Sequence, residues 1–406
     1  MKVGYKKTSL GFIPDSWCIS KLKDLGEFKN GINKSKEDFG FGNPLLNLDD
    51  VFGNNLIEDN SNFGLVNCND KEILNYNLKK GDIVFIRSSV KPEGVGLTTL
   101  INNNLNNTVY SGFTIRFRMN NDFIIQHDFK RYMFYENQFR NILMSKSSIS
   151  ANTNINQESL NSLEVIIPTI KEQKAIADCL SIWDKGLSIQ SKLITVKENR
   201  KKALIQQLLT GKKRLPGFNK DWKEVKLREL FEERNETKIL DLPLLSIGQD
   251  GIYPQTDSNK RDISNTDKSK YKRIAPGDIG YNTMRMWQGR SALSSLEGIV
   301  SPAYTILKPR NNVNSYYFSI LLKTSKLTNL FWRNSQGLVD DTLNCKYKDF
   351  SKIKYFVPSL EEQNEIVAIL KTAEKEIQIE KEKLADLQKQ KKGLMQRLLT
   401  GNVRLL

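Results

Sequence analysis

The sequence contains very little histidine and no clustered cysteine, and these two absences exclude several kinds of chemistry. His127 is the only histidine among 406 residues, so two-histidine metal motifs are excluded and a histidine-based catalytic triad is a poor expectation. Its surroundings, "IIQHDFKRYMF", are typical of the opening of a helix, which favours a structural role. The four cysteines lie far apart and form no C-x-x-C pair, so neither a metal site nor redox chemistry is expected of Cys18, Cys68, Cys179 and Cys345.

Long hydrophobic runs are also missing. No apolar stretch approaches the roughly 18 residues that a membrane-spanning helix needs. The first residues, "MKVGYKKTSLGFIPDSW", carry positive charge but no hydrophobic segment, so we expect no secretory signal peptide. Together with the reduced thiols, this predicts a cytoplasmic protein with no membrane association.

What the chain does contain is an excess of positive charge. There are 62 lysines and arginines against 46 aspartates and glutamates, a formal net charge of +16. The 39% of apolar residues can build cores, and the length predicts about two to four domains. A polyanionic partner is the leading explanation of the charge, with nucleic acid ahead of membrane. A solvated basic surface is the alternative that charge alone leaves open.

The second positive feature is an internal repeat. "IIPTIKEQKAIADCL" (166–180) aligns with "FVPSLEEQNEIVAIL" (356–370) at a shift of 190 positions, from Pro168 to Pro358. The same shift aligns "KKALIQQLLTGKKRL" (201–215) with "KKGLMQRLLTGNVRL" (391–405). One register holds over about fifty residues without a gap, which indicates a duplicated unit.

Each copy of the repeat has the start and stop signals of a long helix. Thr169-x-x-Glu172 and Ser359-x-x-Glu362 fit capping boxes, and Gly211 and Gly401 stand where a C′ glycine belongs. A helix of about 38 residues would be about 57 Å long. Between these signals the positions step 4-3-4-3, and this heptad pattern predicts a coiled-coil seam. The seam comprises Ile176, Leu180, Trp183, Leu187, Gln190, Ile194, Leu204 and Leu208, then Ile366, Leu370, Ala373, Ile377, Glu380, Leu384, Leu387, Leu394 and Leu398, with Lys197, Lys201 and Lys391 at the remaining steps.

The connection between the helices predicts their direction. About 145 residues separate them, and the ends of a compact domain of that size are expected to lie close together. The two helices should therefore run antiparallel. Gln190 and Glu380 fall near the middle of the seam, where polar residues can fix the register at a cost in stability. The alternative is that both face solvent.

The segments before the helices also match each other, although more weakly. "GFIPDSWCISKLKDL" (11–25) resembles "GFNKDWKEVKLREL" (217–230), and "LKKGDIVFIRSS" (78–89) resembles "IAPGDIGYNTMR" (274–285). Strands are expected at Ile83–Arg87, Phe113–Arg118, Val165–Ile167, Ile299–Leu307 and Lys354–Val357, and helices at Phe129–Leu143 and Ser315–Trp332.

These patterns predict an α/β fold class. Two mixed α/β domains are separated by two long helices that form an antiparallel coiled coil, with pseudo-two-fold symmetry. The expected boundaries are 1–167 for the first domain, 168–211 for the first helix, 212–357 for the second domain, 358–401 for the second helix and 402–406 for a tail.

Taken together, these phrases resemble the specificity subunit of type I restriction–modification enzymes over nearly the whole chain. The resemblance rests on "GFIPDSW…KLKDL", on the two helix-start phrases, on "KKALIQQLLTGKKRLPGF" (201–218) and on "GDIGYNTMRMWQGR…GIVSPAYTILKP" (277–309). It implies that the domains are target-recognition domains, each reading one half of a bipartite, asymmetric DNA sequence. It also implies that the helices are the family's conserved spacer regions.

The resemblance further implies which partners and cofactors are involved. The helices would dock two DNA methyltransferase subunits and, through the assembled enzyme, two restriction and translocase subunits. The chain itself would be non-catalytic and hold no cofactor. S-adenosylmethionine would belong to the methyltransferase, and ATP and Mg²⁺ to the nuclease.

The best DNA-contact candidate is "YNTMRMWQGR" (281–290). Asn282 and Gln288 are expected to bond base edges, Arg285 and Arg290 to engage guanine or phosphate, and Trp287 to pack on sugar or base. The alternative is that the methionines and Trp287 are core and the arginines are ordinary surface residues.

Other DNA-contact candidates follow from the repeat. "IRSSVKPEGVG" (86–96) is the counterpart of 281–290, and "SKSSISANTN" (145–154) pairs with "SQGLVDDTLN" (335–344). The candidates in these segments are Arg87, Ser88, Ser89, Lys91, Lys146, Ser147, Asn152 and Gln336, with Lys270, Lys272 and Arg273 as phosphate contacts. Each has an alternative as a plain turn or a solvated charge.

Two rival classes remain open. One is a coiled-coil scaffold that binds other proteins through its globular ends. The other is a nuclease, because Pro14-Asp15 followed by Glu27-Phe28-Lys29 fits the loose P-D…E-x-K pattern. The repeat argues against the nuclease, since Glu232-Glu233-Arg234 near the matching place has no lysine.

Overall fold

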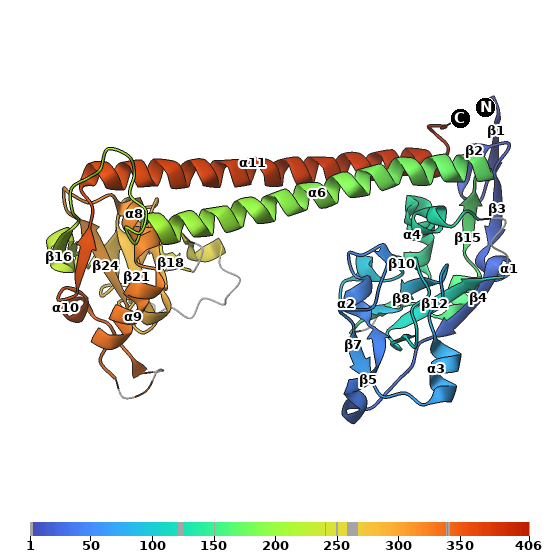
Figure 1. Cartoon of the computed structure of the whole chain (residues 1–406), viewed down its shortest axis with the longest axis horizontal. Coiled ribbons are helices and arrows are strands. Elements are labelled where there is room, and N and C mark those ends of the chain that lie inside the picture. The colour runs from blue at the N-terminus through green and yellow to red at the C-terminus, as the bar shows by residue number, and fades with distance from the viewer. Residues whose placement is uncertain are drawn as a thin grey trace. The chain divides into compact units, whose positions relative to one another are not determined.

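The computed structural model describes residues 3–120, 125–149, 151–239, 241–248, 251–257, 267–337, 339 and 342–405. The chain divides into two compact units (Figure 1). The first unit is Met1–Ser191 with Lys383–Leu406, and the second is Lys192–Glu382. Each unit therefore contains one globular segment and a part of both long helices.

The two long helices form where the repeat predicts them. Helix α6 is Ile170–Leu208 and α11 is Leu360–Leu399. The hydroxyls of Thr169 and Ser359 each accept a hydrogen bond, at 3.4 Å, from the amide three residues later. Gly211 and Gly401 both take a left-handed φ of +70° just after the helices end, a conformation that glycine adopts at little cost. The predicted starts and stops are confirmed.

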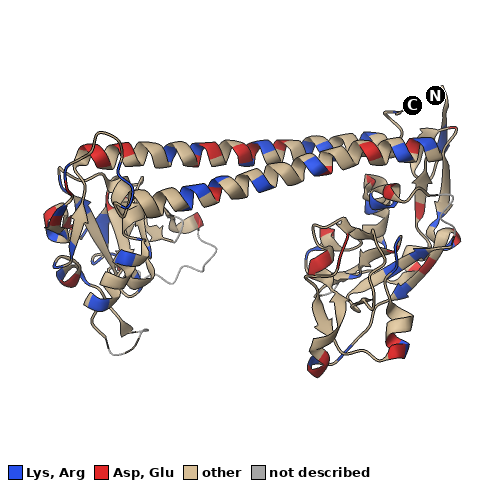
Figure 2. Ribbon diagram, viewed as in Figure 1, with Lys and Arg blue, Asp and Glu red and all other residues tan. Residues whose placement is uncertain are grey.

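Ion pairs within each unit show the direction of the helices, since they join the two helices or join the start of one helix to the segment just after the other. In the first unit the pairs are Glu172–Arg404 and Asp184–Lys391; in the second they are Lys197–Glu376, Lys201–Glu374 and Arg214–Glu362. In both units, as the residue number rises along α6 and the segment after it, the residue number of the ion-pair partner in or just after α11 falls. The helices are therefore antiparallel, as predicted. Figure 2 shows basic and acidic residues interspersed along both ribbons.

Every predicted seam position is buried or half-buried. The buried ones are Ile176, Leu180, Gln190, Ile194, Leu208, Ile366, Leu370, Ile377 and Leu398. Gln190, at 6% exposure, does not face solvent, and half-buried Glu380 lies 3.9 Å from the ammonium of Lys197. The seam thus has a polar centre rather than a continuous apolar one. None of the helices among the described residues is long and apolar enough to cross a membrane.

The globular part of the first unit is built on a five-stranded sheet in the order β4-β12-β8-β10-β6. Its strands are Gly26–Asn30, Thr114–Met119, Ile83–Ile86, Thr98–Ile101 and Leu56–Ile57. The smaller sheets are β1 (Tyr5–Thr8) with β2 (Gly11–Pro14), β3 (Cys18–Lys21) with β15 (Glu164–Ile167), β11 (Val109–Tyr110) with β5 (Phe39–Leu46) and β7 (Gly64–Val66), and β13 (Ser148–Ile149) with β14 (Thr153–Asn154) and β9 (Ser88–Ser89). Phe28, Phe85, Phe117 and Phe134 pack together in the main core.

The second unit repeats this plan with a four-stranded sheet in the order β17-β24-β21-β22. Its strands are Phe231–Glu233, Tyr304–Pro309, Ile279–Asn282 and Ser291–Leu293. The two-stranded sheets are β16 (Lys223–Lys226) with β25 (Lys354–Val357), β18 (Leu245–Ile247) with β19 (Ile252–Pro254), and β20 (Lys272–Ile274) with β23 (Gly298–Val300). Strand order β17-β24-β21-β22 matches β4-β12-β8-β10, so the duplicated mixed α/β fold class is confirmed.

Short helices and single 3₁₀ turns complete both units. In the first unit they are α1 (Leu22–Leu25), η1 (Lys36–Asp38), α2 (Leu48–Val51), α3 (Asp70–Tyr76), η2 (Pro92–Gly94), η3 (Asp128–Arg131), η4 (Met133–Tyr135), α4 (Asn137–Ser145) and α5 (Gln157–Asn161). In the second they are α7 (Leu227–Leu230), η5 (Gln255–Asp257), η6 (Met286–Gln288), α8 (Ser315–Leu321), α9 (Ser325–Asn334) and α10 (Tyr347–Phe350).

Three expected elements are divided in the structure. The helix predicted over Phe129–Leu143 becomes η3, η4 and α4, because the Glu136 carboxylate caps a new helix by accepting from the amides of Gln138 and Phe139 at 2.8 and 2.7 Å. The helix predicted over Ser315–Trp332 breaks into α8 and α9 at Leu322–Thr324.

The strand predicted over Ile299–Leu307 is the third divided element. It becomes β23 and β24, with Pro302 in the gap between them. Proline has no amide hydrogen to donate to a sheet, so a break at this point follows from the residue itself.

Candidate nucleic-acid interface

A buried glutamate at the start of each long helix ties that helix to the rest of its unit. The indole of Trp17 donates to the Glu172 carboxylate at 2.8 Å, and the guanidinium of Arg404 pairs with the same carboxylate at 2.5 Å. Burial would raise the pKa of Glu172, but the hydrogen bonds from Arg404, Trp17 and Thr169 together hold it below its usual value. Glu172 is therefore a structural anchor.

The second unit repeats this anchor at the matching positions. The indole of Trp222 donates to the Glu362 carboxylate at 3.1 Å, and Arg214 binds both carboxylate oxygens, at 2.8 and 2.9 Å. Arg214 also lies over the Trp222 ring, 5.7 Å from its centroid. The basic, leucine-rich phrase that ends each helix therefore supplies the arginine that neutralises the start of the other helix.

A second repeated contact joins each helix to the neighbouring domain. The Tyr132 hydroxyl donates to Asp184 of α6 at 2.6 Å, and Lys391 of α11 pairs with the same carboxylate. In the second unit, Tyr316 donates to Glu374 of α11, and Lys201 of α6 pairs with that carboxylate at 2.7 Å. The lysines and the carboxylates are each 190 positions apart. We call these two groups the polar nodes; sequence reasoning placed both lysines on the seam but missed their partners.

The candidate segments of the first domain come together in one small sheet. Strand β9 pairs with β14, and β14 pairs with β13, so the segments 86–91 and 145–154 lie side by side apart from Ser150, which is outside the described residues. This juxtaposition could not be read from the sequence, because the two segments are more than fifty positions apart.

The side chains of these first-domain segments differ in how freely they reach solvent. Arg87 is half-buried and donates to the Gly112 carbonyl at 3.3 Å, while Ser89 is 6% exposed and accepts from the Lys91 amide. Ser147 is half-buried and donates to a backbone carbonyl, and Ser88 is also half-buried. Lys91, Lys146 and Asn152 are exposed.

The segment 281–290 of the second domain divides between core and surface. Met286 is fully buried, while Trp287 is half-buried and donates to the Met284 carbonyl at 3.1 Å. Half-buried Asn282 accepts from the Met284 amide at 3.0 Å. Gln288 and Arg290 are exposed, and Arg285 is half-buried. Both alternatives raised for this segment therefore apply, each to different residues.

The segment 335–344 lies next to 281–290. The Cys345 amide donates to the Thr283 carbonyl at 2.9 Å, and exposed Gln336 forms an antiparallel bridge with Asn344. Leu338, Asp340 and Asp341 of this segment lie outside the described residues. The paired segments of the second domain thus come together as those of the first domain do.

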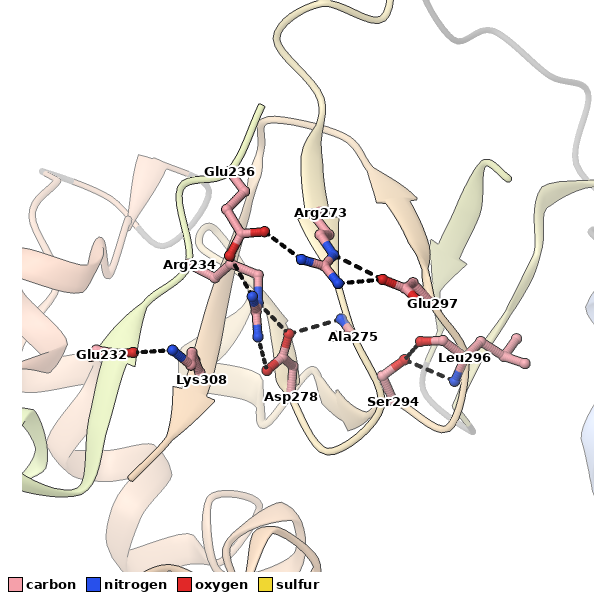
Figure 3. Close-up of polar contacts among 10 residues, drawn as sticks. All are labelled: Glu232, Arg234, Glu236, Arg273, Ala275, Asp278, Ser294, Leu296, Glu297 and Lys308. Carbon is pink, nitrogen blue, oxygen red and sulfur yellow. Dashed lines mark hydrogen bonds and ion pairs between the residues drawn. The ribbon is translucent and has the colours of Figure 1, made fainter. Parts of the chain in front are cut away.

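Two of the three predicted phosphate contacts already have acidic partners within the protein. Lys272 lies 3.3 Å from Glu233. Arg273 pairs with Glu236 at 2.7 Å and with Glu297 at 2.5 Å (Figure 3). The network continues through Arg234, which joins Glu236 to the buried Asp278 of a Gly-Asp turn (Figure 3). These contacts favour a structural role for Lys272 and Arg273. Lys270 is exposed.

The outer face of α9 is a surface that sequence reasoning missed. Helix α9 packs against η6, and its exposed residues are Ser325, Lys326, Asn329, Trp332 and Arg333. Trp332 is 50% exposed. The missed signal was a helical period of basic, amide and aromatic residues in a stretch with no acidic residue.

Two residues of the loose nuclease pattern, Asp15 and Lys29, make ordinary structural contacts. Asp15 lies in the turn after β2, where its amide donates to the Gly4 carbonyl at 3.0 Å. The Lys29 ammonium donates to the Asn75 carbonyl at 2.9 Å and lies over the Tyr76 ring. Among the described residues, no three histidine, cysteine or acidic side chains lie together as a metal-ion site would require.

Two solved structures share this fold. One is described as "Structural basis underlying complex assembly and conformational transition of the type I R-M system"; it has a TM-score of 0.61 and 14% identity, over 96% of this chain and 99% of that one. The other is the HsdS subunit from Thermoanaerobacter tengcongensis, with a TM-score of 0.51 and 15% identity over 96% and 98% of the two chains.

Two sequence relatives match nearly the whole chain and about a third of it, respectively. The "Putative type I restriction enzyme MjaX specificity subunit" of Methanocaldococcus jannaschii is 25% identical, over 99% of this chain and 97% of that protein. The "Type I restriction enzyme EcoKI specificity subunit" of Escherichia coli K12 is 26% identical, over 37% of this chain and 32% of that protein.

The family comparison matches both halves of the chain. Residues 14–198 and 219–389 each match the family described as "Type I restriction modification DNA specificity domain". The two matches follow the internal repeat and together cover most of the chain. The chain therefore belongs to the family of type I restriction–modification DNA specificity proteins, as the sequence resemblance predicted.

Proposed function

We propose that this chain is the non-catalytic specificity subunit of a type I restriction–modification complex, and that it recognises a bipartite, asymmetric DNA target. One observation carries the proposal. The two units share one sheet order, and each brings two polar segments together beside a helix, yet those segments differ in sequence. Two similar scaffolds with unlike surfaces suit two unlike half-sites.

The two kinds of DNA contact have separate tasks. Lysines and arginines that neutralise phosphates provide affinity that falls as salt concentration rises. Amide and guanidinium groups at base edges provide sequence preference. Among the candidates, Gln288, Arg290, Lys91, Lys146, Asn152, Gln336 and Lys270 are exposed.

The long helices are the proposed docking surface for the methyltransferase subunits. On the first-unit part of α6, Ile182 and Ile189 are 68% and 67% exposed and stand seven positions apart, on one helix face. On the second-unit parts, Val196 of α6 and Ile379 of α11 are 63% and 52% exposed. Apolar side chains in such numbers on a helix surface are typical of a protein contact.

The remaining parts of the enzyme are those that the resemblance to type I specificity subunits implies. Two methyltransferase subunits bind the helices, and two restriction and translocase subunits join through the assembled enzyme. S-adenosylmethionine belongs to the methyltransferase, and ATP and Mg²⁺ belong to the nuclease, so this chain holds no cofactor. The complex acts in the cytoplasm, where DNA methylation takes place.

A footprint on DNA carrying the methylated sequence tests the proposal. The chain assembled with its methyltransferase subunit should protect two short patches separated by bases whose identity has no effect on binding. A single continuous patch contradicts the two-reader arrangement.

Two rival functions predict different results. A coiled-coil scaffold that binds only proteins shows no salt-dependent affinity for DNA. A self-contained nuclease cleaves DNA with Mg²⁺ and loses that activity on Asp15→Ala, whereas the specificity subunit shows no cleavage to lose.

A further inference from the structure

The positive charge of the chain is distributed very unequally between the two domains. Residues 212–357 contain 26 lysines and arginines against 16 acidic residues, a net charge of +10. Residues 1–167 contain 19 against 18, a net charge of +1. Since two domains of one fold are expected to read two DNA half-sites, so large a difference needs a physical explanation.

The difference is visible on one pair of matching helices. Helices α4 and α9 lead into the paired segments 145–154 and 335–344, and each buries an aromatic and a leucine four positions apart: Phe139 and Leu143 in α4, Leu327 and Phe331 in α9. In both units a left-handed glycine lies close to the helix, one or two positions after a 3₁₀ turn (η2 in the first unit and η6 in the second). Gly96 lies against Leu143 and Arg140, and Gly289 lies against Thr328.

The exposed faces of these two helices carry different chemistry. The exposed residues of α4 are Asn137, Asn141 and Ser145, which are all neutral. Its one charged residue, Arg140, is turned into the protein and donates to the carbonyls of Glu93 and Val95 at 3.1 and 2.6 Å. The first domain therefore presents no cation from this helix.

The matching face of α9 is basic and aromatic. Lys326 and Arg333 are exposed on α9, and exposed Arg290 lies just after the adjacent turn η6. None of the three pairs with an acidic side chain among the residues that the structure describes, although Lys326 also lies over the Tyr355 ring. Trp332 stands on the same face with half its surface exposed.

We infer that the surface formed by Arg290, Lys326, Trp332 and Arg333, which we call the α9 face, is the main phosphate-binding surface of the chain. It follows that the two domains engage DNA in different ways. The second domain anchors the duplex through Arg290, Lys326 and Arg333, with Trp332 packing on sugar or base. The first domain adds sequence preference through neutral groups and contributes little to the salt-dependent affinity. This inference rests on the proposed function, since it concerns how the same DNA is bound.

The consequence is an unequal response to salt. Each phosphate contact contributes a slope of about −0.9 to the dependence of log K on log salt concentration. One contact then makes the affinity at 0.15 M salt roughly fivefold higher than the affinity at 1 M salt. Three contacts on the α9 face should account for most of the slope that this chain contributes.

The test compares two matched triple variants of the full chain, each assembled with its methyltransferase subunit. One carries Arg290→Gln, Lys326→Gln and Arg333→Gln; the other carries Arg87→Gln, Lys91→Gln and Lys146→Gln in the first domain. Affinity for a 30-base-pair duplex of arbitrary sequence is measured from about 50 to 200 mM salt, the range over which phosphate contacts dominate. Thermal melting confirms that both variants are folded.

The outcomes separate this inference from the proposed function. The α9 variant should make the slope less negative by about two to three units. The first-domain variant should make it less negative by less than about one unit. Equal losses, or a larger loss from the first domain, overturn the inference while the DNA-binding function stands. If the unmodified assembly does not bind DNA at all, the proposed function fails first.

Discussion

Arg404, close to the carboxyl end of the chain, forms an ion pair with Glu172 at the start of α6. The carboxylate side chain is only 4% exposed, and Trp17 donates to it from the N-terminal domain. The two ends of the chain therefore meet at one buried charge. Arg214 and Glu362 reproduce this relationship in the second unit.

Removing the arginine should destabilise the first unit. Arg404→Ala leaves the Glu172 carboxylate buried without its cation, and we expect a loss of about 2 kcal/mol in the free energy of unfolding. The value lies below the range for fully buried pairs because Arg404 is itself 30% exposed. Chemical denaturation measures the change. The exposed Arg397, on the last turn of α11, is the matched control, and Arg397→Ala should change stability by less than about 0.5 kcal/mol.

The same glutamate predicts a dependence on pH. Its pKa is lowered in the folded protein, so the folded state binds a proton less readily than the unfolded state does. The stability it contributes is present above the pKa of the unfolded state, about 4.3, and is lost as the pH falls through the folded value. Glu172→Gln should therefore be less stable than the unmodified protein at pH 7. The difference should shrink towards pH 3, and a difference that stays constant over this range would contradict the assignment.

The polar nodes should couple the helices more strongly than surface charges do. Asp184 and Lys391 have side chains that are 18% and 15% exposed, whereas Lys174 and Asp178 on α6 are 68% and 60% exposed. A double-mutant cycle on Asp184 and Lys391 should give a coupling of at least about 1 kcal/mol. The same cycle on Lys174 and Asp178 should give less than about 0.5 kcal/mol. Equal couplings would show that the node does not hold the helices together.

Sequence preference should change in one half-site at a time. Gln288→Ala in the second domain should relax base preference in one half of the target, at a cost of about 1–3 kcal/mol per lost base contact. Asn152→Ala should act on the other half only. Binding to duplexes with single substitutions in each half measures both effects. Arg273→Ala serves as a control, because its acidic partners predict lower stability of the second domain with an unchanged preference.

The exposed isoleucines of α6 should matter for assembly and not for folding. Ile182→Glu together with Ile189→Glu should lower the recovery of the methyltransferase subunit in co-purification at least tenfold, because charges would replace the apolar contact. Thermal melting should stay unchanged, since both side chains are mostly exposed. Ser188→Glu, on a neighbouring exposed position, is the control. Full recovery of the partner with the double variant would place docking elsewhere.

The long helices were predictable because their signals are local. Capping boxes at Thr169 and Ser359, heptad spacing and the terminal glycines act within a few residues of one another. The antiparallel direction needed only the length of the connection between the helices. Both predictions are confirmed by the structure.

The side-chain partners could not be predicted, because they depend on packing between distant segments. Tyr132 meets Asp184 across 52 positions and Lys391 meets it across 207. The network that surrounds Arg273 forms only when β20 pairs with β23. Glu136 had an ordinary helical context in the sequence, and only its capping role divides the expected helix.

The most direct test of the two-reader account is methylome sequencing of cells that carry this chain with its methyltransferase subunit. The account predicts a split motif, with two short specified halves separated by a constant number of unspecified bases. It also predicts that Gln288→Ala changes only one of the halves. A continuous methylated motif, or no methylation that depends on this chain, would contradict the account.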